Sequence, residues 1–386
     1  MELLGKSKAE LREFLVGMGA PAYRADQLYH ALYAERKFDF EKMTNLSAAL
    51  RERLRKEVRI TLPAVKQRFV STDGSVRYLF SLGASEDTSQ KENKAEVVDG
   101  TGKRNERTEP RERVASPLRP ASVEAVFMPS EGRQTICIST QAGCAVDCQF
   151  CLTAQLGLIR NLSAAEILAQ VLVALEENKD HLAPQSNVVL MGQGEPLLNF
   201  DNVMAALRIL LAPEGVGLSP KHVTLSTSGI VPGIERLAQE KVRPKLAISL
   251  NASNDEQRDK LMPINRKYPL KVLLEACKKY PLRPWEHLTF EYVMLGGVND
   301  APEDARRVVK LLAPLKSVKV NLIPWNPGEL PFREPSAERI EEFQRILKEK
   351  GVRAFVRYSR GRDVMAACGQ LALLQVKTTP LPLSSD

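Results

Sequence analysis

Three cysteines within eight residues constrain this chain more than any other feature of its sequence. Cys144, Cys148 and Cys151 are separated by three residues and then by two. Three thiolates can bind three irons of a [4Fe–4S] cluster, which leaves the fourth iron without a protein ligand. An iron with an open position can bind a further molecule and take part in chemistry. The spacing therefore favours a reactive cluster over a site that only stabilises the fold.

A zinc site is the main alternative for these cysteines. Structural zinc usually has four ligands, commonly in Cys-x2-Cys pairs, and the sequence contains no second pair. The four histidines lie far from the cysteines in sequence and lack metal-binding spacing, so none is given a role. A cluster is the favoured interpretation. The histidines are His30, His181, His222 and His287.

The chain from residue 133 onward alternates between apolar strands and amphipathic helices. This alternation predicts a parallel sheet covered by helices, as an open or a closed (β/α) barrel. A capping box formed by Ser163 and Glu166 marks the start of the helix that follows the cysteines. The expected strands are 135–139, 187–191, 222–226, 245–250, 288–295, 317–323 and 352–358.

Polar or turn-forming residues follow several of these strands. The cysteine loop follows strand 135–139, and residues 192–196 and 226–229 follow the next two strands. Asn251 and residues 325–327 occupy the same place after later strands. In barrels of parallel strands, chemistry gathers at the carboxyl ends of the strands. We therefore expect these segments to converge on one ligand.

The sequence divides into four parts. In the first, Asn45 is expected to cap the last of several amphipathic helices. In the second, two β-rich segments flank residues 84–120, which contain no Phe, Tyr or Trp and are predicted to be a flexible insertion. The parts are a helical accessory domain (1–60), a β-hairpin linker (61–132), the barrel core (133–360) and a C-terminal segment that carries Cys368 (361–386).

The charge and the cysteine usage restrict the class of protein. A net charge of +8 and a pI of about 9.1 suit a polyanionic partner such as nucleic acid, although many basic proteins bind none. No apolar run approaches the roughly 20 residues of a membrane span, and the N-terminus lacks the apolar core of a signal peptide. We expect a cytoplasmic protein with no membrane partner, whose six cysteines are metal-binding or catalytic and not disulfide-bonded.

Several motifs together resemble one known family. The cysteine spacing, with Phe150 before the last cysteine, resembles the signature of the radical S-adenosylmethionine (SAM) superfamily. The turn at 194–196 is weak evidence alone, but it resembles that superfamily's GxxxGEP-type element. Across nearly the whole chain apart from 84–120, the sequence resembles the RlmN-type radical-SAM RNA methyltransferases. The segments that carry this resemblance are 19–26, 43–47, 141–155, 191–199, 225–229, 246–250, 262–265 and 321–327.

The resemblance implies a fold and an activity. The fold is a radical-SAM partial or complete (β/α) barrel with an N-terminal helical, RNA-binding accessory domain. The activity is methylation of carbon 2 of adenosine in 23S rRNA and tRNA, through a methyl-cysteine intermediate. A related antibiotic-resistance type methylates carbon 8, but Thr153 to Gln155 and the N-terminal helices favour carbon 2. The implied cofactors are a [4Fe–4S] cluster and SAM, two per turnover, in a monomer served by a flavodoxin-like or ferredoxin-like electron donor.

The resemblance also implies roles for single residues. Cys368 matches the cysteine that is itself methylated, Cys137 the second catalytic cysteine, and Glu124 the proposed proton acceptor. Asn251 departs from the family pattern, where histidine is expected after Ala-Ile-Ser-Leu. The implied cluster ligands are Cys144, Cys148 and Cys151, and the implied SAM-contacting residues are Gly194, Glu195, Ser226, Ser249, Leu250, Asn251 and Asn326.

Without the resemblance, simpler interpretations are available. The three cysteines outside the loop would be buried core residues: Cys137, Cys277 and Cys368. With the resemblance taken into account, only Cys277 is still interpreted as a core residue. Glu124, which alternates with apolar neighbours, would be a solvent-facing strand residue. The four arginines in 353–362 suit RNA phosphates or a solvated strand end equally well. A radical-SAM enzyme acting on a protein or small molecule, and an RNA-binding protein with a structural metal, are the competing functional classes.

Overall fold

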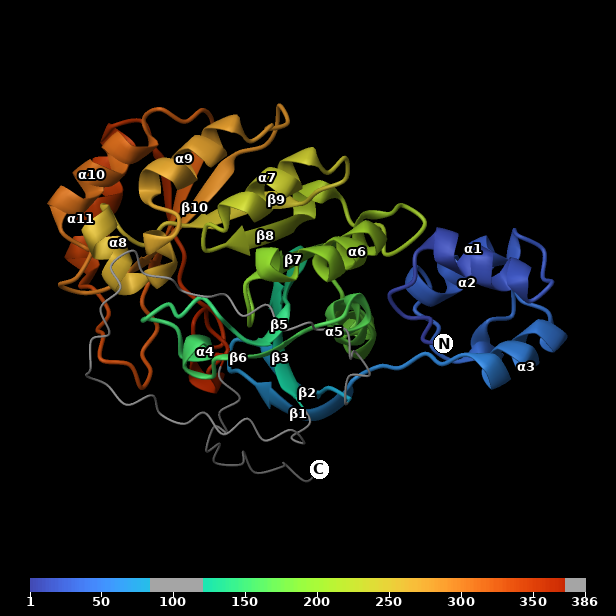
Figure 1. Cartoon of the computed structure of the whole chain (residues 1–386). Helices are drawn as coiled ribbons and strands as arrows, with labels where there is room; N and C mark the ends of the chain where they lie inside the picture. The colour runs from blue at the N-terminus through green and yellow to red at the C-terminus, as the bar shows by residue number, and fades with distance from the viewer. Residues whose placement is uncertain (84–120, 372–386) are drawn as a thin grey trace, which may run out of the picture.

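Within residues 1–83 and 121–371, which the computed structural model describes, ten strands form one sheet (Figure 1). The strand order is β1-β2-β3-β4-β7-β8-β9-β10-β11-β12. From β4 to β12 all neighbours are parallel, while β1 to β4 pair antiparallel. The strands are β1 (Ala64–Val70), β2 (Val76–Ser81), β3 (Ser122–Ser130), β4 (Arg133–Cys137), β7 (Gln185–Leu190), β8 (Val223–Thr227), β9 (Lys245–Ser249), β10 (Leu288–Met294), β11 (Val318–Pro324) and β12 (Arg353–Val356).

The expected radical-SAM α/β barrel is confirmed, and it is a partial barrel. The sheet order ends at β1 and β12, which do not pair with each other in the described residues. The segment after β12 crosses this opening. Asp363 accepts a hydrogen bond from the Ser71 hydroxyl at 2.6 Å, and the Gly361 amide donates to Asp73 at 3.0 Å. Ser71 and Asp73 both belong to the turn between β1 and β2. The C-terminal segment therefore connects the two edge strands of the sheet.

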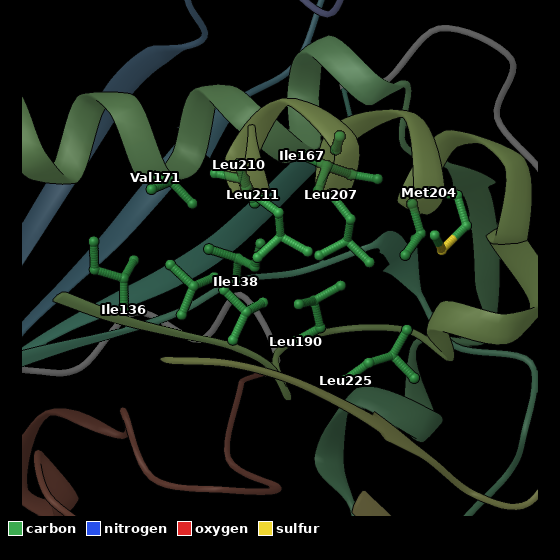
Figure 2. Close-up of a cluster of buried hydrophobic side chains, with 14 of the residues drawn as sticks. Ile136, Ile138, Ile167, Val171, Leu190, Met204, Leu207, Leu210, Leu211 and Leu225 are labelled. Atoms are coloured by element: carbon green, nitrogen blue, oxygen red, sulfur yellow. The ribbon is translucent and has the colours of Figure 1, made fainter. Parts of the chain in front are cut away.

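Helices cover the outer face of the sheet because each presents an apolar stripe to it (Figure 1). Figure 2 shows one such contact, in which Ile136 and Leu190 of the strands meet Ile167 of α5 and Leu207 of α6. The Ser163–Glu166 capping box starts α5, as expected. The helices of this layer are α5 (Ala164–Glu177), α6 (Phe200–Leu211), α7 (Val231–Gln239), α9 (Leu270–Lys279), α10 (Pro302–Leu312) and α11 (Ala337–Glu349), and α8 (Asp255–Leu261) follows β9.

The N-terminal residues form a helical unit beside α6 (Figure 1). It contains α1 (Lys8–Gly17), α2 (Arg24–Tyr33) and α3 (Ala48–Glu57). The predicted cap of α3 is wrong by two residues. The Ser47 hydroxyl accepts from the Leu50 amide and caps the helix, whereas the Asn45 side chain donates to the Gln27 carbonyl at 3.0 Å. Asn45 is therefore used in tertiary packing, which its local sequence does not reveal.

Short elements around the cysteine loop were not expected. β5 (Gln141–Gly143) and β6 (Leu158–Asn161) pair antiparallel on either side of the loop, and α4 (Leu152–Gln155) follows the last cysteine. The insertion predicted at 84–120 and the end of the C-terminal segment, 372–386, lie outside the described residues. In the described part of the chain, no helix has the length and apolar character needed to cross a membrane.

Candidate active site at the carboxyl ends of the strands

The three loop cysteines line one cavity of about 170 Å³ at the carboxyl ends of the parallel strands. Backbone contacts hold the loop in place: the Cys144 amide donates to the Gly157 carbonyl at 3.0 Å, and the Gln149 amide donates to the Leu261 carbonyl at 2.9 Å. Asp147 adopts a left-handed conformation, with φ of 60°, at the turn of the loop. The loop therefore presents all three sulfurs to the same space.

The surroundings of these thiols fit a buried iron–sulfur cluster. Burial raises the pKa of Cys144 to about 12 and that of Cys148 well above its ordinary value, so binding of iron must release protons. Apolar side chains, including Phe150 and Trp325, pack around Cys148 and Cys151. Among the described residues, no three His, Cys, Asp or Glu side chains are arranged to hold one metal ion. A cluster does not need that arrangement, because each cysteine binds a different iron.

The residues expected to contact SAM come from four strand ends, and most line this cavity. Gly194 follows β7, Ser226 is in β8, Ser249 ends β9, and Asn326 follows β11. Gly194 has φ of +97°, and a Cβ there would lie 2.5 Å from a side-chain atom of Gln141, so the position requires glycine. The residues from the expected set that line the cavity are Gly194, Glu195, Ser226, Ser249, Asn251 and Asn326.

Leu250 is the member of that set whose side chain lies elsewhere. It is fully buried in the main hydrophobic core, and only its backbone is near the site. Asn251 uses its side chain within the protein, where its amide oxygen accepts from the Val293 amide at 2.8 Å and its amide nitrogen contacts the Met262 sulfur at 3.3 Å. Asparagine thus fixes the strand end in this chain at the position where histidine was expected.

Two polar side chains leave bonding capacity for a ligand in the cavity. The Asn326 amide nitrogen donates to Ser359 and to the Cys368 carbonyl, but its oxygen is buried and has no partner among the described residues. Glu195 is 3 % exposed; one oxygen accepts from the Ser228 amide at 2.7 Å and hydroxyl at 2.8 Å, and the other accepts from the Leu197 amide at 3.1 Å. Buried polar groups normally have partners, so the Asn326 oxygen suits a ligand with hydrogen-bond donors, and the Glu195 carboxylate can accept a further bond from such a ligand.

A second, larger cavity of about 840 Å³ occupies the barrel interior and shares part of its wall with the first. Cys368 lines both cavities, whereas Cys137 lines the larger one. The Cys368 side chain is solvent-accessible because it borders these spaces, although protein surrounds it. Burial raises the pKa of Cys368 to about 11. Burial also raises the pKa of Cys137, and the nearby Cys368 raises it further. The fold thus brings the two distant cysteines together.

Glu124 is fully buried, so the interpretation as a solvent-facing strand residue is wrong. It forms an ion pair with the buried Arg77, and Gln193 donates to its second oxygen at 3.3 Å. Arg77 also lies 3.9 Å from the centre of the Phe69 ring. Val126, two residues along β3, packs in one cluster with Cys137, so Glu124 is on the same face of the sheet. Glu124 itself lines neither cavity.

Two charged residues at the site were missed by sequence reasoning. Glu291 on β10 lines both cavities beside Cys368, and burial raises its pKa to about 6. Its carboxylate accepts from the Asn321 side chain at 2.9 Å. Arg258 on α8 is fully buried behind the smaller cavity, which the loop cysteines line and which is called the SAM-side cavity below because the residues expected to contact SAM line it. Glu291 could have been noticed in the sequence, because it is the one charged residue in the strand 288–294. Arg258 could not, because it lies in a helix with many charged residues.

The partial barrel, the cysteine loop and the polar strand ends together define a radical-SAM protein. The family description "Radical SAM superfamily" matches residues 138–312, and "Ribosomal RNA large subunit methyltransferase N-terminal domain" matches residues 1–60. A solved structure, a radical SAM methyltransferase from Sphaerobacter thermophilus, is 39% identical with a TM-score of 0.82 and covers 96% of this chain and 99% of that one.

Curated relatives make the assignment more specific. The probable dual-specificity RNA methyltransferase RlmN of Koribacter versatilis is 49% identical over 94% of this chain and 99% of the relative. The dual-specificity RNA methyltransferase RlmN of Geobacter sulfurreducens is 43% identical over 96% of this chain and 92% of the relative. The chain therefore belongs to the RlmN family of radical-SAM RNA methyltransferases, whose superfamily uses SAM and a [4Fe–4S] cluster.

Replacement of Glu195 tests the SAM side of the site. We expect Glu195→Gln to weaken SAM binding by about ten- to a hundredfold if Glu195 is, as the resemblance implies, the charge-assisted partner of the SAM ammonium. The substitution also places an amide against the Ser228 donors. Equilibrium dialysis of the cluster-loaded protein measures the affinity. Glu256→Gln, at a surface ion pair with Lys260, is the control and should bind normally. Unchanged affinity of Glu195→Gln would contradict the assignment.

Proposed function

We propose that this protein methylates carbon 2 of adenosine in 23S rRNA and tRNA, with Cys368 as the carrier of the methyl carbon. The main supporting observation is that Cys368 lines both the cavity of the cluster cysteines and the larger cavity that contains Cys137. A group carried on Cys368 can therefore be loaded on one side and delivered on the other. Membership of the RlmN family supports the same reaction.

The chemistry explains why two further cysteines are needed. Carbon 2 of adenine is electrophilic, and so is the methyl group of SAM, so direct transfer between them fails. When bound, the cluster and SAM supply a methyl group and a 5′-deoxyadenosyl radical, with two SAM molecules used per turnover. Cys368 loses its proton and accepts the methyl group. That S-methyl group would lose one hydrogen atom to the 5′-deoxyadenosyl radical, and its carbon then bonds to carbon 2, so that it bridges the Cys368 sulfur and the adenine ring.

Two side chains complete the proposed reaction. A base such as Glu124 accepts the proton from carbon 2, and Arg77 holds its carboxylate in place. Cys137, after losing its own proton, then attacks the sulfur of Cys368, which breaks the sulfur–carbon bond and leaves a disulfide between the two cysteines. The released carbon takes up a proton to become the product methyl group, and the one electron left over from the radical would return to the cluster. Glu124 lines neither cavity, so its role as the base requires that bound RNA bring carbon 2 within its reach.

The larger cavity has the charge expected for an RNA substrate. Cationic side chains of five different segments line it, and cations that neutralise phosphates dominate RNA affinity. Of the four arginines in 353–362, Arg357 and Arg360 line this cavity, whereas Arg362 pairs with Glu334. The adenine must leave its stack to reach Cys368. The cationic residues of the lining are Arg133, Lys221, Lys245, Lys319, Arg357 and Arg360.

The remaining parts of the proposal concern the cellular setting. We infer that a flavodoxin-like or ferredoxin-like protein donates the electron, because the cluster must be reduced for each radical. We also infer a monomer that works in the cytoplasm, where cellular thiols can reduce the disulfide that each turnover leaves between Cys137 and Cys368. The N-terminal helices are proposed to bind the RNA outside the barrel.

Nucleoside mass spectrometry tests the product directly. The cluster-loaded protein, SAM and a reductant are incubated with 23S rRNA or with tRNA, and the RNA is then digested. We expect 2-methyladenosine from both RNAs, and none from Cys148→Ala, which lacks a cluster ligand. Formation of 8-methyladenosine alone would support the antibiotic-resistance type instead. Methylation of neither RNA, with SAM cleavage intact, would favour a protein or small-molecule substrate.

A further inference from the structure

Arg258 is a fully buried arginine that joins two strand ends of the SAM-side cavity. Its guanidinium donates to the Ser228 carbonyl at 2.7 Å, beyond the end of β8. It also donates to the carbonyls of Ser249 at 2.9 Å and Leu250 at 3.1 Å, at the end of β9. Ser228 and Ser249 both line the cavity. One side chain therefore fixes the spacing of two walls of the site.

The positive charge of Arg258 has no carboxylate partner in contact. Its fourth hydrogen bond goes to the Asn265 side-chain oxygen at 3.0 Å, and no salt bridge in the described residues includes it. Asp255 and Asp259 are nearby, but both accept from the other end of the Asn265 amide. A buried charge without a contacting counter-ion is costly. An anionic group in the neighbouring cavity would offset that cost.

The cluster loop lies against the helix that carries Arg258. The Gln149 amide, between two of the loop cysteines, donates to the Leu261 carbonyl at the end of α8. Leu261 and Met262 pack in one apolar cluster with Cys148 and Cys151. Ser228 and Ser249, whose carbonyls accept from Arg258, line the same cavity as Cys148. The Arg258 guanidinium is therefore directly behind the wall of the cavity that the cluster ligands share.

We propose that Arg258 is a positioning residue that joins the two strand-end loops of the SAM site and supplies the buried positive charge that stabilises the reduced cluster. The inference rests on the cluster and SAM of the proposed function and not on the RNA substrate. Reduction adds one negative charge to a cluster bound by three thiolates. A fixed cation nearby favours that added charge, and so it raises the reduction potential.

Variants that separate charge from geometry test this proposal. Arg258→Gln removes the charge and keeps some hydrogen bonding, whereas Arg258→Lys keeps the charge but loses the forked geometry. Arg266→Gln changes an exposed arginine at the end of η5 (Pro263–Arg266) and is the control. Each full-length protein is loaded with cluster, checked for iron content and thermal unfolding, and titrated with reductant while the reduced cluster is followed by electron paramagnetic resonance. SAM affinity is measured by equilibrium dialysis.

We expect Arg258→Gln to shift the reduction potential to more negative values and to weaken SAM binding by at least about tenfold. Arg258→Lys should keep the wild-type potential but bind SAM more weakly, and Arg266→Gln should match the wild type in both. A wild-type potential and affinity in Arg258→Gln would overturn the proposal. If that variant does not fold, Arg258→Lys decides: unchanged SAM affinity refutes the joining role, and a shifted potential refutes the charge role. Failure of the wild type to hold a cluster would refute the proposed function instead.

Discussion

Cys368→Ala is expected to abolish RNA methylation, with a loss of at least about 10³-fold, because no other group can carry the methyl carbon. Cluster binding and reductive cleavage of SAM should persist, since Cys144, Cys148 and Cys151 are unchanged. Two measurements on the same samples separate these outcomes. Mass spectrometry quantifies 2-methyladenosine in the RNA, and chromatography quantifies 5′-deoxyadenosine formed from SAM.

A matched control exists within the chain. Cys277 is 1 % exposed on α9 and packs in the main core, as its amphipathic pattern predicted. Cys277→Ala should cost some stability but leave methylation intact. The Cys368 peptide of the wild type should also carry an added methyl group when the protein is incubated with SAM. Intact RNA methylation by Cys368→Ala would contradict the carrier role and favour a radical-SAM reaction without a cysteine pair.

Cys137→Ala is expected to arrest the reaction at a later stage, with the RNA covalently joined to the protein. Without the Cys137 sulfur, nothing displaces the product from Cys368, so released 2-methyladenosine should fall by at least about 10³-fold. The adduct should appear as a slower band on a denaturing gel. Nuclease and protease digestion should then leave an adenosine-containing mass on the Cys368 peptide.

The adduct has its own controls. Cys137→Ala combined with Cys368→Ala should form none, because the carrier is absent. Cys277→Ala should release product at the wild-type rate. Free 2-methyladenosine at wild-type yield from Cys137→Ala would show that Cys137 is a buried structural cysteine after all. Its exposed fraction of 8 % and its place in an apolar cluster with Val126 are the features that such a structural cysteine would have.

The barrel and its cysteine loop were predictable because their signals are local. Apolar strands alternate with amphipathic helices, and expected bounds such as 245–250 and 317–323 differ from those of β9 and β11 by no more than one residue at either end. The rule that parallel strands end at one rim also predicted that polar segments after several strands would meet. Most of them do line one cavity. These inferences need only periodicity and the order of elements.

Contacts between distant side chains could not be predicted in the same way. Glu124 seemed suited to solvent from its neighbours, but its environment is set by Arg77, 47 residues earlier in the chain. The Leu250 side chain packs in the main core, so any contact of this residue with SAM is left to its backbone. The four acceptors of Arg258 come from three separate segments. Only the folded chain brings such partners together.

The segment that bridges the barrel opening couples the closure of the barrel to the position of the carrier cysteine. Residues 361–371 both close the gap between β12 and β1 and carry Cys368. If the segment detaches, the wall opens and the carrier leaves at the same moment. Opening of the barrel edge and loss of the carrier sulfur are thus coupled through one segment. A carbon carried on Cys368 is held at the two cavities only while this segment keeps its contacts with the turn between β1 and β2.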